Sequence, residues 1–153
     1  MIKPLVIFPD ERLTAACSSV SVFDEELKAL VQDLFDTLYA NDGIGLAAPQ
    51  IGILKRVFVM DCRKGNNPFH PLVYVNPKVV CTTLQTSTEE EGCLSLPGVF
   101  LPVTRAARVG VSGRGVLGEY LQGELTGLEA RCFAHECDHT QGVLFVSRAD
   151  KTA

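Results

Sequence analysis

The sequence predicts one domain in which two helices flank a middle region of largely antiparallel sheet. Three patterns lead to this prediction: a helical period from Asp24 to Tyr39, short β-branched runs from Arg56 onward, and a second helical segment after Thr126. The chain has 153 residues, of which 46% are apolar and 21% charged, a composition typical of a globular protein. We therefore expect residues 1–153 to form a single domain.

The first helix is predicted from apolar residues that recur on one helical face. They are Leu27, Leu30, Val31, Leu34, Phe35 and Leu38. Asp24 is a suitable N-cap because its carboxylate can accept from an amide of the first turn. The stop signal is Asn41-Asp42-Gly43.

The middle of the chain alternates β-branched runs with Gly, Asn and Pro, the pattern of strands and turns. The runs are Val57 to Met60, Leu72 to Val75, Val79 to Thr83, Arg108 to Ser112 and Val116 to Gln122. Because Gly113-Arg114-Gly115 separates the last two runs, we expect a hairpin turn there.

The second helix is expected to begin near Thr126, because Thr126 and Glu129 have the spacing of a capping box. In that motif the Thr126 hydroxyl accepts from the Glu129 amide, and the Glu129 carboxylate reaches back. Gly142 provides a stop signal sixteen residues later.

Charge and hydropathy exclude several classes of partner. The formal net charge is −4, and no basic stripe favours nucleic acid. No apolar run approaches the ~20 residues of a membrane span, and Pro4 and Pro9 interrupt the N-terminus too early for a signal peptide. Six cysteines without a CxxC pair suggest free thiols or a metal role. We expect a cytoplasmic protein that binds neither nucleic acid nor membrane.

The second helix contains His135-Glu136-Cys137-Asp138-His139, an HExxH pentamer. Histidines four residues apart lie one above the other on a helix, so both imidazoles can bind one metal ion. Glu136 flanks that position, where a general base for a metal-activated water belongs. Core histidines held by hydrogen bonds are the alternative interpretation.

A catalytic metal site usually has three protein ligands and one open position. Only fourteen residues follow His139, and Asp150 is their one carboxylate, with no His, Glu or Cys among them. We therefore expect the third ligand upstream, where Cys93 follows Gly92. A thiolate suits a transition metal, and the amides of a short loop can donate to an oxyanion. On its own, this segment fits a structural cysteine better than a ligand.

A further unusual segment, residues 43–50, has the sequence GIGLAAPQ. Its two glycines let the backbone approach another group closely, and Gln50 adds a neutral amide that both donates and accepts. In isolation, a tight turn packed in the core explains the segment equally well.

GIGLAAPQ at 43–50, EGCLSLP at 91–97 and HECDH at 135–139 together resemble the three signature motifs of the peptide deformylase family. The resemblance covers nearly the whole chain. It implies an α+β fold in which antiparallel β-sheets surround a central HExxH-bearing helix, with an N-terminal amphipathic helix. It also implies Cys93, His135 and His139 as ligands of one divalent metal ion, natively Fe²⁺ and often Zn²⁺, Ni²⁺ or Co²⁺ in purified protein.

The resemblance also assigns roles around the ion. It implies Glu136 as general base and then acid, Gln50 and the Leu94 amide as groups that polarise the formyl oxygen, and Gly45 as a partner of the substrate backbone. An apolar pocket for the methionine side chain would be lined by Ile44, Leu128, Cys132 and His135. Arg131 borders this pocket, and we expect its stem to cover the pocket while its guanidinium reaches water.

Members of this family remove the N-formyl group from the initiator methionine of newly synthesised polypeptides and release formate. The resemblance thus implies a metal-dependent hydrolase with N-formylmethionyl nascent peptides as partners. The chain ends at Ala153 without the C-terminal helix of many bacterial members, so we do not expect ribosome docking by that route. We expect a monomer. An organellar protein whose targeting peptide has been removed would show the same sequence features.

Two other functions fit parts of the pattern. A zincin-like endopeptidase would cleave unformylated internal peptide bonds, but such enzymes usually take their third ligand from downstream of the pentamer. A non-catalytic metal-binding domain has no evident need for Glu136 and Gln50 beside an open metal position. Formate release from a formylmethionyl peptide discriminates among the three functions.

Overall fold

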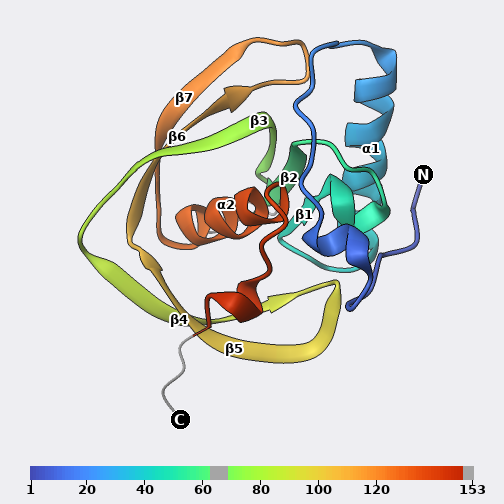
Figure 1. Ribbon diagram of the computed structural model, residues 1–153. Coiled ribbons are helices and arrows are strands. Elements are labelled where there is room, and N and C mark those ends of the chain that lie inside the picture. The colour runs from blue at the N-terminus through green and yellow to red at the C-terminus, as the bar shows by residue number, and fades with distance from the viewer. Residues whose placement is uncertain (63–68, 150–153) are drawn as a thin grey trace.

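The structure is a computed structural model that describes residues 1–62 and 69–149. Helix α2 (Gly127–His139) lies at the centre of the described part, and antiparallel strands surround it (Figure 1). One sheet has the strand order β1-β2-β3-β6-β7, and β4 and β5 form a separate two-stranded sheet. This is the α+β class that we expected.

The remaining elements follow the order of the chain. The strands are β1 (Gly45–Ala47), β2 (Val57–Asp61), β3 (Pro71–Thr82), β4 (Thr86–Cys93), β5 (Leu96–Ala106), β6 (Arg108–Arg114) and β7 (Tyr120–Thr126), and helix α1 spans Glu25–Ala40. Short 3-10 helices cover Glu11–Thr14, Ala48–Ile51 and Phe145–Ser147. In the described residues, no helix is both long enough and apolar enough to cross a membrane.

Strand β2 carries a helix on each side, because successive side chains of a strand point to opposite faces. Phe58 packs against Phe133 of α2, with ring centroids 5.1 Å apart. Val57 and Val59 instead belong to the apolar cluster that contains Leu34 of α1. The large sheet is therefore covered by α1 on one face and by α2 on the other.

Helix α1 covers the segment with the predicted helical period. Its N-cap is Asp24, whose Oδ1 accepts from the Leu27 amide at 3.1 Å. The helix ends at Ala40 with Asn41 as C-cap, and the Gly43 amide donates back to the Leu38 carbonyl at 3.2 Å. The end of α1 therefore leads directly into the glycine-containing segment and β1.

The two strands expected at Leu72–Val75 and Val79–Thr83 are wrong as separate elements, because both belong to the single strand β3. The register against β6 shifts between Val75 and Lys78. Asn76 has φ of +51° there, a conformation that Asn tolerates better than most residues. An Asn-Pro step that predicts a turn is here a β-bulge, where Pro77 does not have to donate to the ladder.

The hairpin expected around Gly113-Arg114-Gly115 exists, but its turn lies later in the chain. Strand β6 continues to Arg114, which pairs with Tyr120 of β7. The loop between them contains Gly118 at φ +85°, a left-handed conformation that glycine adopts without strain. The left-handed turn therefore falls at Gly118 rather than at Gly113-Arg114-Gly115.

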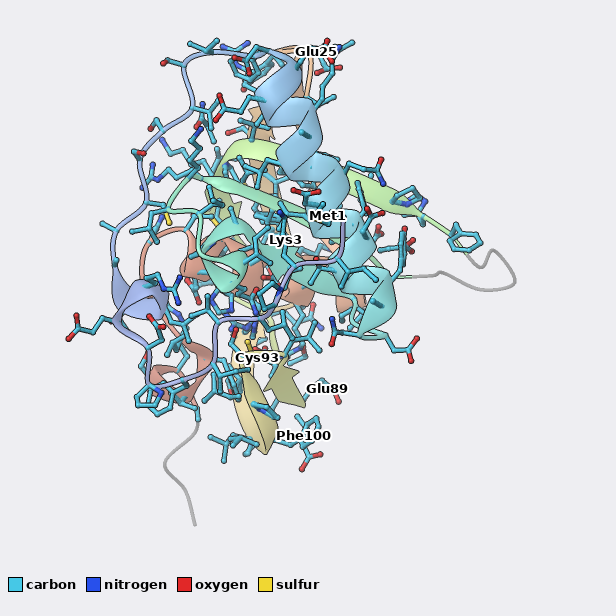
Figure 2. All side chains as sticks on the ribbon, turned by 90° about the vertical axis from the view of Figure 1, so that its right-hand side faces the viewer. Met1, Lys3, Glu25, Glu89, Cys93 and Phe100 are labelled. Atoms are coloured by element: carbon cyan, nitrogen blue, oxygen red, sulfur yellow. The ribbon has the colours of Figure 1, made fainter. Side chains whose placement is uncertain are left out.

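The β4–β5 hairpin had no counterpart in the predicted elements. Its strands are joined by the two-residue turn Leu94-Ser95, because Cys93 pairs with Leu96. Figure 2 shows Cys93 at the inner end of this hairpin, with Glu89 and Phe100 farther out. The hairpin thus carries the cysteine from the edge of the molecule toward α2.

The capping box expected at the start of α2 is wrong in its side-chain contacts. Thr126 is the N-cap, but its side chain makes no capping hydrogen bond. Glu129 is instead buried and lies 3.3 Å from His70 Nε2. The helix ends at His139, and Gly142 follows at φ +74°. The Glu129 carboxylate thus takes part in a tertiary contact with His70.

Candidate metal centre and active site

Three potential ligand residues meet where the β4–β5 hairpin touches α2. His135 and His139 are buried one turn apart on α2, with ring centroids separated by 5.0 Å. Cys93 Sγ, at the end of β4, lies 3.4 Å from His139 Nε2. The ligand atoms of the three residues all lie within 4.8 Å of one another. The fold therefore brings Cys93 to two histidines that lie more than forty positions later in the sequence.

The donor set fits a divalent transition metal ion. One thiolate and two imidazoles are soft and borderline ligands of the kind that Fe²⁺, Zn²⁺, Ni²⁺ and Co²⁺ accept. Two buried polar atoms at this place, Glu136 Oε1 and His139 Nδ1, have no hydrogen-bond partner among the described residues. Because buried polar atoms are normally paired, the unpaired Glu136 Oε1 indicates a site built to hold a ligand. His139 Nδ1 is the ring nitrogen that faces away from Cys93, because Nε2 is the one that lies near its Sγ.

Glu91 orients one of the histidines, and the sequence did not single it out. Its Oε1 lies 3.0 Å from His135 Nδ1, which leaves the other ring nitrogen to face a metal ion. Burial opposes ionisation of Glu91, but hydrogen bonds from His135 and Arg105 outweigh it and lower the Glu91 pKa to about 2. Glu91 is one of three consecutive glutamates, and its place as the first residue of EGCLSLP at 91–97 is the one sequence signal that distinguishes it.

Glu136 is buried beside the three ligand residues and close to strand β1. A Cβ atom on Gly45 would lie 2.6 Å from Glu136 Oε2 and 2.7 Å from Cys132 Sγ. Only glycine lets the β1 backbone approach α2 so closely. Burial raises the pKa of Glu136 to about 7. A carboxylate in this setting is suited to accept and return a proton.

Gln50 is held on the other side of the cysteine. Its side chain is buried, and its Oε1 accepts from the Ala47 amide at 2.9 Å. Its Nε2 points to Cys93 Sγ at 3.4 Å and to Ser95 Oγ at 3.1 Å. The amide is thus fixed with its donor side toward the candidate metal centre. Leu94 follows Cys93 in the hairpin turn, so its backbone lies beside the candidate metal centre.

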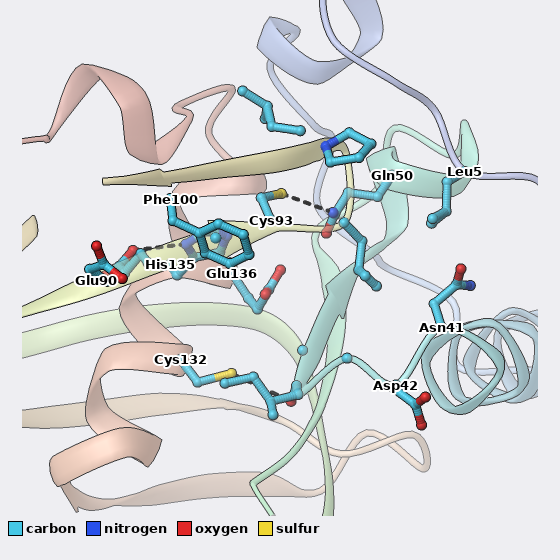
Figure 3. Close-up of a pocket in the computed structure, with 18 of the residues that line it drawn as sticks. Leu5, Asn41, Asp42, Gln50, Glu90, Cys93, Phe100, Cys132, His135 and Glu136 are labelled. Carbon is cyan, nitrogen blue, oxygen red and sulfur yellow. Dashed lines mark hydrogen bonds and ion pairs between the residues drawn. The ribbon is translucent and has the colours of Figure 1, made fainter. Parts of the chain in front are cut away.

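A cavity of about 590 Å³ opens over these groups (Figure 3). Of the site residues expected from the sequence, His139 is absent from its lining, and the others all contribute. They are Ile44, Gly45, Gln50, Cys93, Leu94, Leu128, Arg131, Cys132, His135 and Glu136. Ile44 and Leu128 are 39% and 50% exposed, whereas Cys132 is buried with its Sγ 3.6 Å from the Ile44 carbonyl oxygen. The apolar part of the cavity therefore has an open rim and a closed floor.

The expectation that the Arg131 guanidinium reaches water is wrong. Arg131 is only 7% exposed. Its guanidinium donates to Glu91, to the Val103 carbonyl and to both the carbonyl and the hydroxyl oxygen of Ser87. The β4–β5 hairpin packs over α2 at Arg131 and buries its guanidinium, and the sequence alone did not reveal this packing.

Sequence reasoning also missed part of the cavity wall. Phe100 of β5 is 63% exposed and lines the cavity, as do Leu5 from the N-terminal segment and Asn41 and Asp42 after α1. Figure 3 shows these residues around the opening. Their contribution follows from chain packing rather than from a local motif. Asp150, the one carboxylate downstream of the pentamer, lies outside the described residues.

Comparison with known proteins agrees with the geometry. The family model described as polypeptide deformylase matches residues 2–153. A peptide deformylase of Acidobacterium capsulatum is 45% identical over 148 residues, which cover 97% of this chain and 86% of that protein. One of Rhizobium meliloti is 42% identical over 150 residues, with 98% and 86% covered.

Solved structures show the same likeness. The crystal structure of peptide deformylase from Thermotoga maritima superposes with a TM-score of 0.92 at 39% sequence identity, covering 98% of this chain and 99% of that one. Fold, sequence and the arrangement of the three motifs thus agree over nearly the whole length. The chain belongs to the polypeptide deformylase family, the metal-dependent hydrolases that remove the N-formyl group from the initiator methionine of new polypeptides.

Proposed function

We propose that the cavity between α2, β1 and the β4–β5 hairpin is the active site in which this chain hydrolyses the formamide of N-formylmethionyl nascent peptides. The observation that carries the proposal is the convergence of Cys93, His135 and His139, with ligand atoms within 4.8 Å of one another, next to the buried carboxylate of Glu136. An open apolar cavity adjoins this cluster. A metal centre, a base and a pocket for an uncharged side chain are what the reaction requires.

Cys93, His135 and His139 would hold the ion. When bound, a divalent ion supplies Lewis-acid chemistry that polarises a carbonyl oxygen and activates water. The family resemblance supports Fe²⁺ as the native ion, with Zn²⁺, Ni²⁺ or Co²⁺ as replacements in purified protein. Glu91 holds the His135 ring through Nδ1 at 3.0 Å, which fixes its orientation before any ion arrives.

Glu136 moves the protons of the reaction. Its Oε1 accepts a proton from the water that attacks the formyl carbon, a role supported by its burial and by the lack of another partner for this atom among the described residues. As the carbon–nitrogen bond breaks, the same carboxyl returns the proton to the leaving amine nitrogen. The products are formate and a peptide with a free amino group.

Gln50 and the Leu94 backbone amide stabilise the oxygen that becomes negative during the attack. Gln50 Nε2 is suited to this role because Ala47 and Ser95 already fix its amide plane. Removing one such donor typically lowers the rate by about 10² to 10³-fold. Donors that are oriented in advance need no reorganisation as the charge develops.

The methionine side chain occupies the apolar part of the cavity. Ile44 and Leu128 form its rim, Cys132 lies at its floor, and Gly45 leaves its backbone accessible to the substrate backbone. Arg131 contributes to the same wall. We further propose a monomeric enzyme with one catalytic domain over residues 1–153, because all of these groups come from one chain. We propose that it acts in the cytoplasm, on the nascent peptides that are its substrates.

A formate-release assay tests the proposal directly. Protein purified without oxygen should contain about one metal ion per chain and release formate from formyl-Met-Ala-Ser. The matched peptide acetyl-Met-Ala-Ser and a longer unformylated peptide serve as controls. The proposal would be contradicted if the protein, purified without oxygen, contains no stoichiometric metal and releases no formate from formyl-Met-Ala-Ser. Internal cleavage of the unformylated peptide would favour an endopeptidase instead.

A further inference from the structure

The ligand residues sit on two elements that no strand ladder joins. Cys93 belongs to the two-stranded β4–β5 sheet, whereas His135 and His139 belong to α2. Leu96 and Val103 of β5 pack in an apolar cluster with N-terminal and C-terminal segments. Within the described residues, that cluster contains no α2 side chain. Phe145 of this cluster packs against the His135 ring, with centroids 5.7 Å apart. Direct polar contacts between hairpin and helix further set the distance between the thiol and the imidazoles.

Arg131 of α2 supplies such contacts. Its Nη1 donates to Glu91 Oε2 at 2.6 Å and to the Val103 carbonyl at 2.9 Å. Its Nη2 donates to the Ser87 carbonyl at 2.9 Å and to the Ser87 hydroxyl at 3.1 Å. One guanidinium thus binds both strands of the hairpin, and its planar fork fixes direction as well as distance.

The same contacts reach a metal ligand. Glu91 shares Oε2 between Arg105 and Arg131 and uses Oε1 for His135 Nδ1 and Arg105 Nη2. Arg105 of β5 also donates to Asp138 of α2 at 3.2 Å. Two arginines thus hold the hairpin on the helix. Arg131 reaches from α2 to the hairpin, Arg105 reaches from the hairpin to α2, and both bind the buried Glu91 carboxylate.

We propose that Arg131 is a positioning residue of the metal centre, which sets Cys93 against His135 and His139 by holding the β4–β5 hairpin on α2. The inference rests on the proposed function of these three residues as the ligands. The sequence placed Arg131 at the border of the methionine pocket, and the inference assigns its guanidinium to the hairpin rather than to substrate. Its basis is that four hydrogen bonds already bind the guanidinium within the chain.

Removing the Arg131 guanidinium leaves the rest of the cluster paired. Arg105 keeps its two bonds to Glu91, and Arg148 keeps two bonds to Asp138. Each carboxylate of the cluster therefore keeps at least one partner. A buried carboxylate without any partner would destabilise the fold strongly. Arg131→Gln should fold with a hairpin that is less firmly held.

The test uses the full chain loaded with Co²⁺, whose absorption spectrum reports ligand identity and geometry. For wild type, Arg131→Gln, Arg131→Lys and Arg148→Gln, the spectrum and the rate of Co²⁺ loss to excess EDTA are recorded, and urea unfolding of the metal-free proteins reports the fold. Arg131→Gln should show a shifted or weakened thiolate-to-cobalt band and Co²⁺ loss faster by about 10 to 100-fold. Arg131→Lys, which keeps the charge without the fork, should be intermediate.

Arg148→Gln is the matched control, because it removes an arginine from the same charge cluster without touching Glu91. It should keep the wild-type spectrum and dissociation rate. If Arg131→Gln also keeps the wild-type spectrum and rate of Co²⁺ loss, the inference is overturned. It is likewise overturned if steady-state assays at full metal occupancy give a raised KM while the rate of Co²⁺ loss is unchanged, because that result marks a substrate contact. If Arg131→Gln fails to fold, Arg131→Lys decides by the same criteria. Wild-type protein that binds no Co²⁺ would contradict the ligand set itself.

Discussion

At the scale of single residues, substitutions of Glu136 and Cys93 should distinguish proton transfer from metal binding. Glu136→Gln keeps the shape and the three ligands but cannot accept a proton, so turnover should fall by about 10² to 10⁴-fold while the metal stays bound. Cys93→Ala should instead lose the metal. Formate release and metal analysis on both variants check this, and equal metal loss in the two would contradict the assigned roles.

Gly45 is the residue whose lack of a side chain most directly affects the site. In Gly45→Ala the new methyl would lie 2.6 Å from Glu136 Oε2 and 2.7 Å from Cys132 Sγ. One of these groups must move, and a displacement of about 1 Å lowers kcat/KM by about 10²-fold. In Gly123→Ala, the control, no described atom beyond the adjoining residues lies within 4 Å of the new Cβ, so its kcat/KM should match wild type. Equal activity in both variants would contradict the close approach.

At the scale of elements, the two helices differ in how they begin. Asp24 accepts from the Leu27 amide, whereas the Thr126 side chain makes no capping bond. Asp24→Ala should therefore lower the free energy of unfolding by about 1 kcal/mol, and Thr126→Ala should leave it nearly unchanged. Urea unfolding of both variants, compared at equal metal loading, measures the difference. A similar loss in Thr126→Ala would indicate a capping box after all.

The elements also show where local patterns lose information. Helix α1 has a clear apolar period, and its Asp24 cap lies where the sequence placed it. Strand β4 has five exposed residues in succession, rich in Ser, Thr and Glu, so it lacks the alternation by which a half-buried strand is detected. The Asn76-Pro77 step resembles a turn, and only pairing with β6 converts it into a bulge. Tertiary pairing overrode local preference in both places.

At the scale of the whole molecule, a bound ion would join the β4–β5 hairpin to α2. A ligand that binds only the folded state stabilises it, by about 4 kcal/mol at a thousandfold excess over Kd. Removal of metal with a chelator should therefore lower the Tm of wild-type protein. Cys93→Ala should show no such response. A wild-type Tm that is the same with and without chelator would contradict a metal that bridges the two elements.

The sequence by itself determined the family and the helix with the HExxH pentamer, because these depend on residue types and on the order and spacing of short motifs. The resemblance also proposed Cys93, His135 and His139 as metal ligands, and the structure brings these three residues together. Tertiary structure alone decided that Glu91 turns inward to His135 and that Arg131 is buried under the hairpin. Among three consecutive glutamates only motif membership marks Glu91, and neither it nor an arginine beside an apolar stripe has a local property that names its partner. The choice arises when a separate two-stranded sheet folds over α2 and excludes water, because buried charges must then pair with one another.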